Sequence, residues 1–327
     1  MVYLQIIAGL IFLLVGAESL VRGASRLARS LGIPPLIIGL TVVAYGTSTP
    51  ELAVSIKGSL EGYGDIALGN VLGSNIFNVL FILGFSALIV PLTVSKQLIR
   101  FDIPIMIGVS LLSWLFSFGG QLNRIEGLIL TVSLIGYTIF LIRWGLTKEK
   151  PGDNLQVGDE RKKRHWHPYM IPLAFIVCGL VFLIIGSQWL VKGAVDLARL
   201  MGVSELLIGL TLVAAGTSFP EVATSIVAAI RGERDIAIGN VVGSNIFNIL
   251  GVLGIATALS GKMPVSKNAL YFDFPVMIAV SLICLPICFS GKKITRWEGA
   301  LFLGFYFIYL SYLILRDNQI IGIPFSK

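Results

Sequence analysis

The chain has 327 residues, of which 55% are hydrophobic and only 13% are charged. A mean hydropathy of +0.87 and repeated apolar runs long enough to cross about 30 Å of hydrocarbon exclude an ordinary soluble protein. The formal net charge of +7 is typical of a membrane protein with basic cytoplasmic loops, so it predicts no nucleic-acid partner. The lipid bilayer is the predicted partner, and no obligate protein partner is expected.

Ten apolar spans predict an all-α polytopic membrane protein. They lie at about 3–22, 34–58, 66–90, 102–119, 125–145, 169–191, 205–229, 236–259, 273–290 and 297–315. The connections that follow the odd-numbered spans, with their edges, hold 17 of the 25 lysines and arginines. The positive-inside rule therefore predicts that these connections face the cytoplasm and that both termini face outside. The expected location is a prokaryotic inner membrane.

Two motifs occur twice at an offset of 170 residues. Residues 39–51 read Gly-Leu-Thr-Val-Val-Ala-Tyr-Gly-Thr-Ser-Thr-Pro-Glu, and residues 209–221 read Gly-Leu-Thr-Leu-Val-Ala-Ala-Gly-Thr-Ser-Phe-Pro-Glu. Residues 65–78 and 235–248 share the pattern Asp-Ile-Ala-x-Gly-Asn-Val-x-Gly-Ser-Asn-Ile-Phe-Asn. The chain is therefore an internal repeat of one unit.

This repeat divides the chain into two halves, 1–145 and 169–327, joined by a hydrophilic linker at 146–168 that we expect in the cytoplasm. The motifs occupy 39–78 in the first half and 209–248 in the second. Because each half holds five spans, an odd number, the second half enters the membrane from the opposite face. Inverted repeats of this kind, with a site near the middle of the bilayer, are an architecture of secondary transporters. We predict ten transmembrane helices in two inverted five-helix repeats.

Each copy of the first motif places one acid, Glu51 or Glu221, inside an apolar span. A charged side chain there costs about 2.5–3.5 kcal/mol even on lenient insertion scales, so a matched pair predicts a role in moving or sensing a cation. Pairing with a buried base is the structural alternative. It is disfavoured, because the four motif-bearing spans contain no lysine or arginine away from their ends.

Hydroxyl and carbonyl oxygens accompany each acid. Pro50 and Pro220 directly precede the acids, and each removes a helical hydrogen bond and frees a backbone carbonyl one turn earlier. Thr47 and Ser48 lie four and three residues before Glu51, so we expect them on the same helix face as its carboxylate. The second copy repeats this pattern with Thr217, Ser218 and Glu221.

The second motif adds a polar stripe at i, i+4 and i+8 of one helix. Its members are Asn70, Ser74 and Asn78 in the first half and Asn240, Ser244 and Asn248 in the second. An all-oxygen site suits a hard cation such as Ca²⁺, which takes six to eight oxygen ligands, whereas zinc or copper would call for histidine or cysteine. Two carboxylates neutralise one divalent or two monovalent ions, as exchange on one site would require. No resident cofactor is predicted.

At these motifs the chain resembles the calcium/cation antiporter superfamily, in its sodium/calcium exchanger branch. The resemblance covers essentially the whole chain. It implies ten helices in two inverted halves, with the first and sixth helices moving across a fixed core, and Ca²⁺ ligation by Glu51 and Glu221. Sodium would be shared among hydroxyl groups and two backbone carbonyls, and the central amides would complete the site. These implied ligands are Thr47, Ser48, Ser74, Thr217, Ser218 and Ser244, the carbonyls of Ala44 and Ala214, and Asn78 and Asn248.

The chain departs from the pattern of some members of this superfamily at one position that bears on the coupling ion. Some relatives in this superfamily carry an aspartate where this chain has Asn248, so the site here holds one less potential negative charge. The leading hypothesis is an antiporter that exports Ca²⁺ in exchange for Na⁺. The alternative is a proton-coupled Ca²⁺ or other cation antiporter with Glu51 and Glu221 as proton carriers, since burial favours a neutral acid. A channel is disfavoured, because it would need a continuous polar path and each half offers only one central polar cluster. An enzyme is not predicted, because the spans show no histidine, cysteine or serine–base arrangement.

Overall fold

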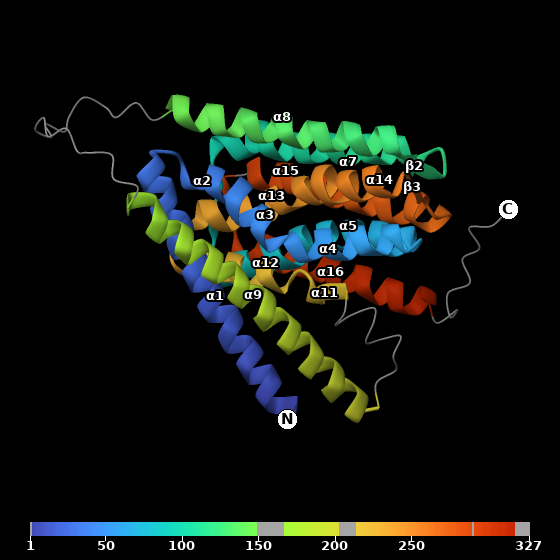
Figure 1. Ribbon diagram of the computed structural model, residues 1–327, viewed down its shortest axis with the longest axis horizontal. Coiled ribbons are helices and arrows are strands. Elements are labelled where there is room, and N and C mark those ends of the chain that lie inside the picture. Colours follow the sequence, from blue (N-terminus) through green and yellow to red (C-terminus); the bar gives the residue numbers. More distant parts are fainter. Residues whose placement is uncertain (1, 149–166, 203–213, 290, 318–327) are drawn as a thin grey trace, which may run out of the picture.

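The computed structural model describes residues 2–148, 167–202, 214–289 and 291–317 (Figure 1). Within these residues, eight helical segments are long and apolar enough to cross a membrane. They are Val2–Leu31, Gly64–Ile89, Leu98–Ser117, Arg124–Thr147, Tyr169–Leu200, Arg234–Ser260, Ala269–Phe289 and Arg296–Leu315. A bent pair, Pro35–Thr47 and Thr49–Leu60, makes a ninth candidate. The prediction of a mainly helical polytopic membrane protein is confirmed.

The helices agree with the predicted spans in order and differ from them in length. The first and sixth helices, α1 (Val2–Leu31) and α9 (His167–Leu200), run well past the predicted ends of their spans. The seventh span is described only in its second half, because residues 203–213 lie outside the described residues, as does most of the linker, 149–166. The count of ten transmembrane helices therefore stays a prediction.

The helices that carry the repeated motifs lie at the centre of the molecule. In the first half they are α4 (Thr49–Leu60) and α5 (Gly64–Phe77), and in the second α12 (Phe219–Ile230) and α13 (Arg234–Phe247). In the most apolar 18-residue stretch of each segment, the share of buried residues is 72% for Gly64–Ile89 and 89% for Arg234–Ser260. For Arg296–Leu315 the share is 11%. The second motif of each half therefore lies in the most enclosed of the long helical segments.

Each first motif contains a helix break. In the first half, α2 (Pro35–Ile38), the π-helical segment η1 (Gly39–Val43) and α3 (Ala44–Thr47) lead to Ser48, and α4 continues at an angle of 46°. In the second half, α11 (Ala214–Gly216) precedes Ser218 and α12. A proline lies in the first turn of both following helices, where its missing N–H needs no partner.

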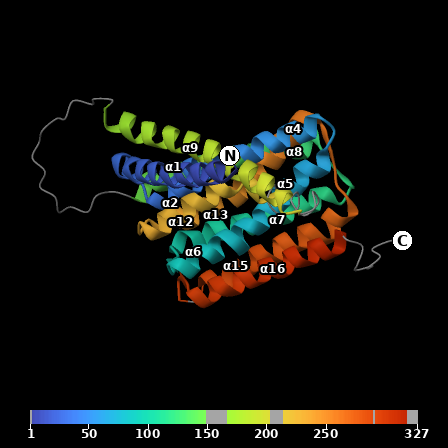
Figure 2. The same ribbon diagram turned by 90° about the horizontal axis from the view of Figure 1, so that it is seen from below.

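Helices α1 and α9 lie side by side, antiparallel, and cross the other helices obliquely (Figures 1 and 2). Glycines spaced by seven residues bring their backbones together. A Cβ atom at Gly16 would lie 2.8 Å from the backbone nitrogen of Leu183, and one at Gly186 would lie 2.7 Å from that of Leu13. The seam between the helices is formed by Gly9, Gly16 and Gly23 of α1 and by Gly179, Gly186 and Gly193 of α9.

Four further π-helical segments interrupt the described helices. They are η2 (Asn78–Leu83), η3 (Leu98–Asp102), η5 (Asn248–Leu253) and η6 (Ala269–Asp273). Two of them begin at the matched residues Asn78 and Asn248. π-Segments inside α-helices are frequent at functional sites, so the two asparagines that end the second motif mark a local irregularity in both halves.

The remaining helices either continue the motif-bearing helices or pack around them. They are α6 (Gly84–Ile89), α7 (Ile103–Ser117), α8 (Arg124–Lys148), α14 (Gly254–Ser260), α15 (Phe274–Phe289) and α16 (Arg296–Asp317). Two short antiparallel ribbons, absent from the all-α prediction, join connections of opposite halves. Strand β1 (Leu92–Thr93) pairs with β4 (Lys293–Ile294), and β2 (Gln121–Asn123) pairs with β3 (Lys262–Pro264).

Candidate cation-binding site

Two buried carboxylates face the hydroxyl groups of the opposite half. Glu51 and Glu221 lie in the first turns of α4 and α12, and each is 1% exposed. Ser218 donates to Oε1 of Glu51 over 2.9 Å, and Ser48 donates to Oε1 of Glu221 over 2.8 Å. The two halves therefore exchange equivalent hydrogen bonds at the helix breaks.

This crossed pairing corrects one prediction. The spacing placed Thr47 and Ser48 on the face of Glu51 in their own helix, but the chain bends by 46° at Ser48. The rule that residues three or four apart share a face applies only within a continuous helix. Ser48 therefore reaches Glu221, and the Thr47 hydroxyl donates to Oδ1 of Asn240 over 3.1 Å.

Within the two motifs, four buried side-chain oxygen atoms have no hydrogen-bond partner among the described residues. They are Oε2 of Glu51, Oε2 of Glu221, Oδ1 of Asn78 and Oδ1 of Asn248. Buried polar atoms in proteins are nearly always paired, and an unpaired one costs about 1–3 kcal/mol, more when it is charged. The four acceptor atoms come from equivalent positions of the two halves. They suit a cation, because a cation can satisfy acceptor atoms that have no hydrogen-bond donor.

One asparagine amide supports the backbone at each acid. The Nδ2 group of Asn70 donates to the backbone carbonyl of Glu51 over 3.2 Å and to the hydroxyl of Ser55 over 2.9 Å. Asn240 repeats both bonds, over 3.4 Å to the carbonyl of Glu221 and 2.9 Å to the hydroxyl of Ser225. These amides fix each broken helix against the neighbouring helix of its own hairpin.

The other predicted ligands lie in the same cluster. The hydroxyls of Ser218 and Ser74 are 3.3 Å apart, and Ser244 donates to the carbonyl of Ala44 over 3.5 Å. Thr217 donates to Oδ1 of Asn70 over 3.4 Å. Ala214 begins α11, but its side chain lies outside the described residues. Each of the other predicted residues therefore contacts at least one further member of the two motifs.

The carbonyl predicted to be freed by Pro220 has a partner. Ser187 of α9 donates to the backbone carbonyl of Gly216 over 2.6 Å. The residue at the equivalent position of α1 is Ala17, which has no hydroxyl group. The broken helix of the second half is therefore tied to α9 by a bond that the first half does not repeat.

No ion pair reaches either carboxylate in the described parts of the chain, so the structural alternative of a buried base has no support there. Nor do those parts contain a cluster of three or more histidine, cysteine, aspartate and glutamate side chains. The donors at the centre are carboxylate, amide and hydroxyl oxygens. This set matches hard cations rather than zinc or copper.

Two buried asparagines behind the site were not assigned a role from the sequence. Asn75 and Asn245 are 2% and 1% exposed and lie three residues before Asn78 and Asn248. Asn78 donates to Oδ1 of Asn245 over 2.9 Å, and Asn248 donates to Oδ1 of Asn75 over 3.2 Å. The repeated Gly-Ser-Asn-Ile-Phe-Asn pattern contained the signal, because all of its polar positions recur in both halves.

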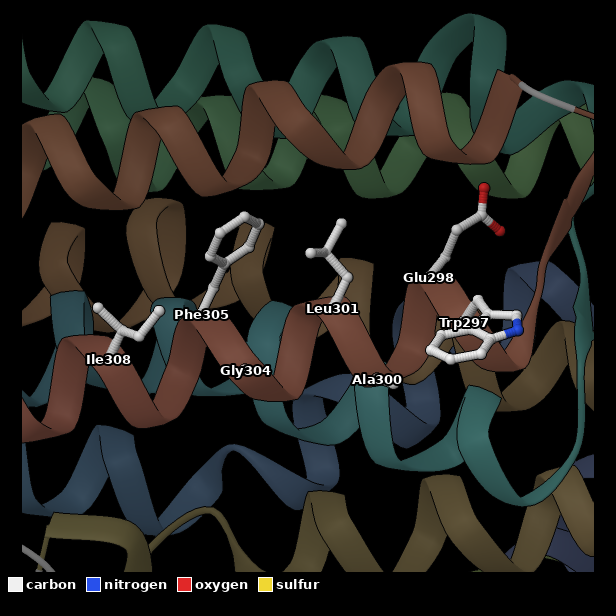
Figure 3. Close-up of a pocket in the computed structure, with 7 residues that line it drawn as sticks. All are labelled: Trp297, Glu298, Ala300, Leu301, Gly304, Phe305 and Ile308. Atoms are coloured by element: carbon white, nitrogen blue, oxygen red, sulfur yellow. The ribbon is translucent and has the colours of Figure 1, made fainter.

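A hollow of about 500 Å³ lies elsewhere, along α16 (Figure 3). Its lining comes from that helix alone and is almost wholly apolar, with the carboxylate of Glu298 near one end. Glu298 also accepts a hydrogen bond from the backbone of Thr295 over 2.7 Å. The hollow contains no residue of the two motifs, so it is separate from the candidate site.

Broken helices that meet in a buried polar cluster are typical of secondary transporters. The profile of the family described as sodium/calcium exchanger protein matches residues 1–143 and 171–315. The chain therefore belongs to the sodium/calcium exchanger protein family.

Three relatives that align with almost the whole chain support this assignment. The chain is 40% identical over 313 residues to "Putative antiporter CaxA" of Alkalimonas amylolytica, covering 94% of this chain and 98% of that protein. It is 38% identical to "Inner membrane protein YrbG" of Escherichia coli strain K12, with 94% and 95% covered. A sodium/calcium exchanger of Methanosarcina acetivorans is 34% identical, with 95% and 98% covered.

A solved structure has the same fold. It is the sodium-calcium exchanger NCX_Mj soaked with 2.5 mM Na⁺ and 0.1 mM Ca²⁺, with a TM-score of 0.80, 30% identity, and 95% of this chain and 97% of that chain covered. The names of the matched family, of two of these relatives and of the solved structure describe exchangers or antiporters, not enzymes. The chain is an integral membrane protein of a cation antiporter family.

Proposed function

We propose that the protein is a secondary antiporter that exports Ca²⁺ in exchange for Na⁺ at a site in the middle of the membrane. The observation that carries the proposal is the set of four unpaired, buried oxygens of Glu51, Glu221, Asn78 and Asn248. Two carboxylates neutralise one Ca²⁺ or two Na⁺, so the same centre can hold either ion in turn. The sodium/calcium exchangers among the relatives support this choice of ions.

In this proposal Ca²⁺ contacts the carboxylates and amide oxygens, and Na⁺ uses hydroxyl and carbonyl oxygens around them. The Na⁺ ligands would be Thr47, Ser48, Ser74, Thr217, Ser218 and Ser244 with the carbonyls of Ala44 and Ala214. The hydrogen bonds of Ser48 and Ser218 to the carboxylates place two of these hydroxyls beside the proposed Ca²⁺ ligands. Binding of one ion would therefore alter the surroundings of the other.

The proposed architecture is ten transmembrane helices in two inverted halves, 1–145 and 169–327, with the linker 146–168 in the cytoplasm. The two ribbons support it. Strands β1 and β3 occupy equivalent positions in the repeat, and so do β2 and β4, yet β1 pairs with β4 and β2 pairs with β3. A segment of 20 helical residues, about 30 Å long, separates β1 from β2. Equivalent connections at opposite ends of the bundle fit inverted halves.

Alternating access would move α1 and α9 against the hairpins α4–α5 and α12–α13. The long, oblique shape of the two helices and the glycine seam that joins them support their movement as one unit (Figure 1). The proposed location is a prokaryotic plasma membrane, with both termini outside. The bacterial and archaeal sources of the relatives support the location.

A proton-coupled antiporter is the second candidate. The observation that favours it is the presence of asparagine at both central positions, 78 and 248, which leaves two carboxylates as the only acids among the four unpaired groups. Protonation of both acids would release a divalent cation without any need for Na⁺. The relative described only as a putative antiporter does not discriminate between the coupling ions.

The test is ⁴⁵Ca²⁺ uptake into proteoliposomes loaded with Na⁺, compared with Na⁺-free vesicles and with the Glu51→Gln variant. We expect uptake that needs the outward Na⁺ gradient and that falls to background in the variant, because a neutral amide cannot replace the carboxylate charge. Uptake without Na⁺ but with an imposed pH gradient would instead establish the proton-coupled candidate. Full uptake by Glu51→Gln would contradict the site in either case.

A further inference from the structure

An asparagine side chain can serve a cation site only in one orientation. Its Oδ1 atom accepts positive charge, whereas its Nδ2 group is a donor and repels a cation. The structure places Oδ1 of Asn78 and of Asn248 among the unpaired oxygens. Some contact must hold both amides in this orientation, because the oxygen and nitrogen ends have nearly the same shape.

The contact comes from one asparagine of the opposite half in each case. Asn78 donates to Oδ1 of Asn245 over 2.9 Å, and Asn248 donates to Oδ1 of Asn75 over 3.2 Å. With their nitrogen ends bonded in this way, the oxygen ends of the two central amides are left unpaired. Asn75 and Asn245 themselves contribute no unpaired oxygen to the site.

The orientation of Asn75 and Asn245 is set in turn by methionine sulfur. The Nδ2 group of Asn245 lies 3.6 Å from Sδ of Met106, and that of Asn75 lies 3.4 Å from Sδ of Met277. A thioether can accept a hydrogen bond but has none to donate, so it favours the nitrogen end of the neighbouring amide. Asn245 also donates to the backbone carbonyl of Asn75 over 3.2 Å.

These contacts form two matched chains, from Met106 through Asn245 to Asn78 and from Met277 through Asn75 to Asn248. Both methionines are at most 1% exposed. Each chain leaves one half of the molecule for the other and then returns. Water cannot readily replace these contacts at such burial, so the protein itself has to supply the orientation.

We propose that Asn75 and Asn245, backed by Met277 and Met106, are positioning residues that keep the amide oxygens of Asn248 and Asn78 directed at the cation. The inference rests on the proposed function of the site as a Ca²⁺ site. Its consequence is specific: the role exists only while the central residue is an amide. An aspartate has two equivalent oxygens and needs no partner to choose between them.

The test is a double-mutant cycle on the purified full-length chain, with Ca²⁺ dissociation constants measured by equilibrium binding of ⁴⁵Ca²⁺. The variants are Asn245→Ala, Asn78→Asp and the double variant. We expect Asn245→Ala to weaken Ca²⁺ binding about tenfold or more when residue 78 is asparagine, and at most about threefold when it is aspartate. A simple packing role predicts the same loss in both backgrounds, and that result would overturn the inference.

Met106→Leu provides a second route that preserves the volume of the side chain and applies even if Asn245→Ala does not fold. This substitution removes an acceptor from Asn245, so we expect it to weaken Ca²⁺ binding when residue 78 is asparagine. In the Asn78→Asp background we expect this loss of affinity to disappear. Met263→Leu is the matched control. Met263 is fully buried and accepts from Thr257 over 3.7 Å, whereas the hydrogen bonds of Asn75 and Asn245 to sulfur go to Met277 and Met106. The Met263→Leu variant should therefore bind Ca²⁺ with unchanged affinity.

Two failures are distinguishable. If the unaltered protein does not bind Ca²⁺, the proposed function falls and the inference falls with it. If the unaltered protein binds Ca²⁺ but Asn245→Ala or Met106→Leu costs the same in both backgrounds, only the positioning role of Asn245 is wrong.

Discussion

Each carboxylate of the site is stabilised by a hydroxyl group from the other half of the molecule. Glu51 accepts from Ser218 and Glu221 accepts from Ser48, over 2.9 and 2.8 Å. Hydrogen bonds to charged groups contribute about 1.5–3 kcal/mol, and more is lost when the remaining partner stays buried. The two serines therefore support the ionised acids and join the halves at one point.

We predict that Ser48→Ala and Ser218→Ala each weaken Ca²⁺ binding about tenfold or more, and by similar amounts, because the two bonds are equivalent. Ser59→Ala is the matched control: Ser59 is a buried serine of α4, but its hydroxyl donates to the backbone carbonyls of Ile56 and Ala256. The Ca²⁺ dissociation constant of each purified variant checks the prediction. Equal affinities in all three variants would contradict it.

At this scale the sequence predicted which residues gather but not which of them touch. The acids, hydroxyls and amides were identified from motif repetition and from the cost of buried charge. The partner of Ser48 could not be predicted, because the bend at this residue ends the helical spacing from which its face was inferred. Asn75 and Asn245 were missed because their role depends on which end of an amide faces the site, and spacing says nothing about that.

Two contacts join α1 to the hairpin α12–α13 at the level of individual elements. Arg231, in the turn after α12, donates to Glu18 of α1 with both Nε and Nη2, each over 2.8 Å. Ser25 of α1 also donates to Glu233. The repeat places Gln188 where the first half has Glu18, and Glu61 where the second half has Arg231. The equivalent pair in the other half therefore cannot form an ion pair.

We predict that Arg231→Gln changes the rate of Ca²⁺ uptake by about 1.5- to 5-fold, while Arg22→Gln changes it little. Exposed ion pairs contribute about 0.2–1 kcal/mol, which sets this range. Arg22 also pairs with Glu18 but lies in the same helix, so it would move with α1, whereas the bond to Arg231 must break if α1 moves against the hairpin. Initial ⁴⁵Ca²⁺ uptake rates in proteoliposomes measure the effect, and identical behaviour of both variants would argue against relative movement at this contact.

The helix breaks were predictable because proline and glycine have defined backbone effects, whereas the pairing of α1 with α9 was not predicted. Its signal was present as glycines at seven-residue intervals in both helices. Reading such a seam from the sequence requires knowing which helix faces which, and apolar periodicity is a weak guide where lipid covers the outer face. The length of α1, which extends to Leu31, was also hidden, because its last turns carry arginines.

At the scale of the whole molecule, two independent observations group the same connections. The charge count assigns the connections that hold β1 and β4 to the cytoplasmic side, and those that hold β2 and β3 to the outside. Strand pairing joins β1 to β4 and β2 to β3, in agreement with that grouping. The pairing does not use charge, and the charge count does not use the structure.

The absolute orientation follows from charge alone and can be tested with single cysteines. In a variant without Cys178, Cys284 and Cys288, we predict that a cysteine replacing the exposed Lys267 reacts with a membrane-impermeant maleimide in intact spheroplasts. A cysteine replacing the exposed Lys96 should react only after the membrane is permeabilised. The physical reason is that translocation of basic segments is disfavoured, and Lys96 lies among the cytoplasmic connections by that rule. The reverse labelling pattern would place the termini inside and make the sidedness of the proposed Ca²⁺ export the opposite of that argued from charge.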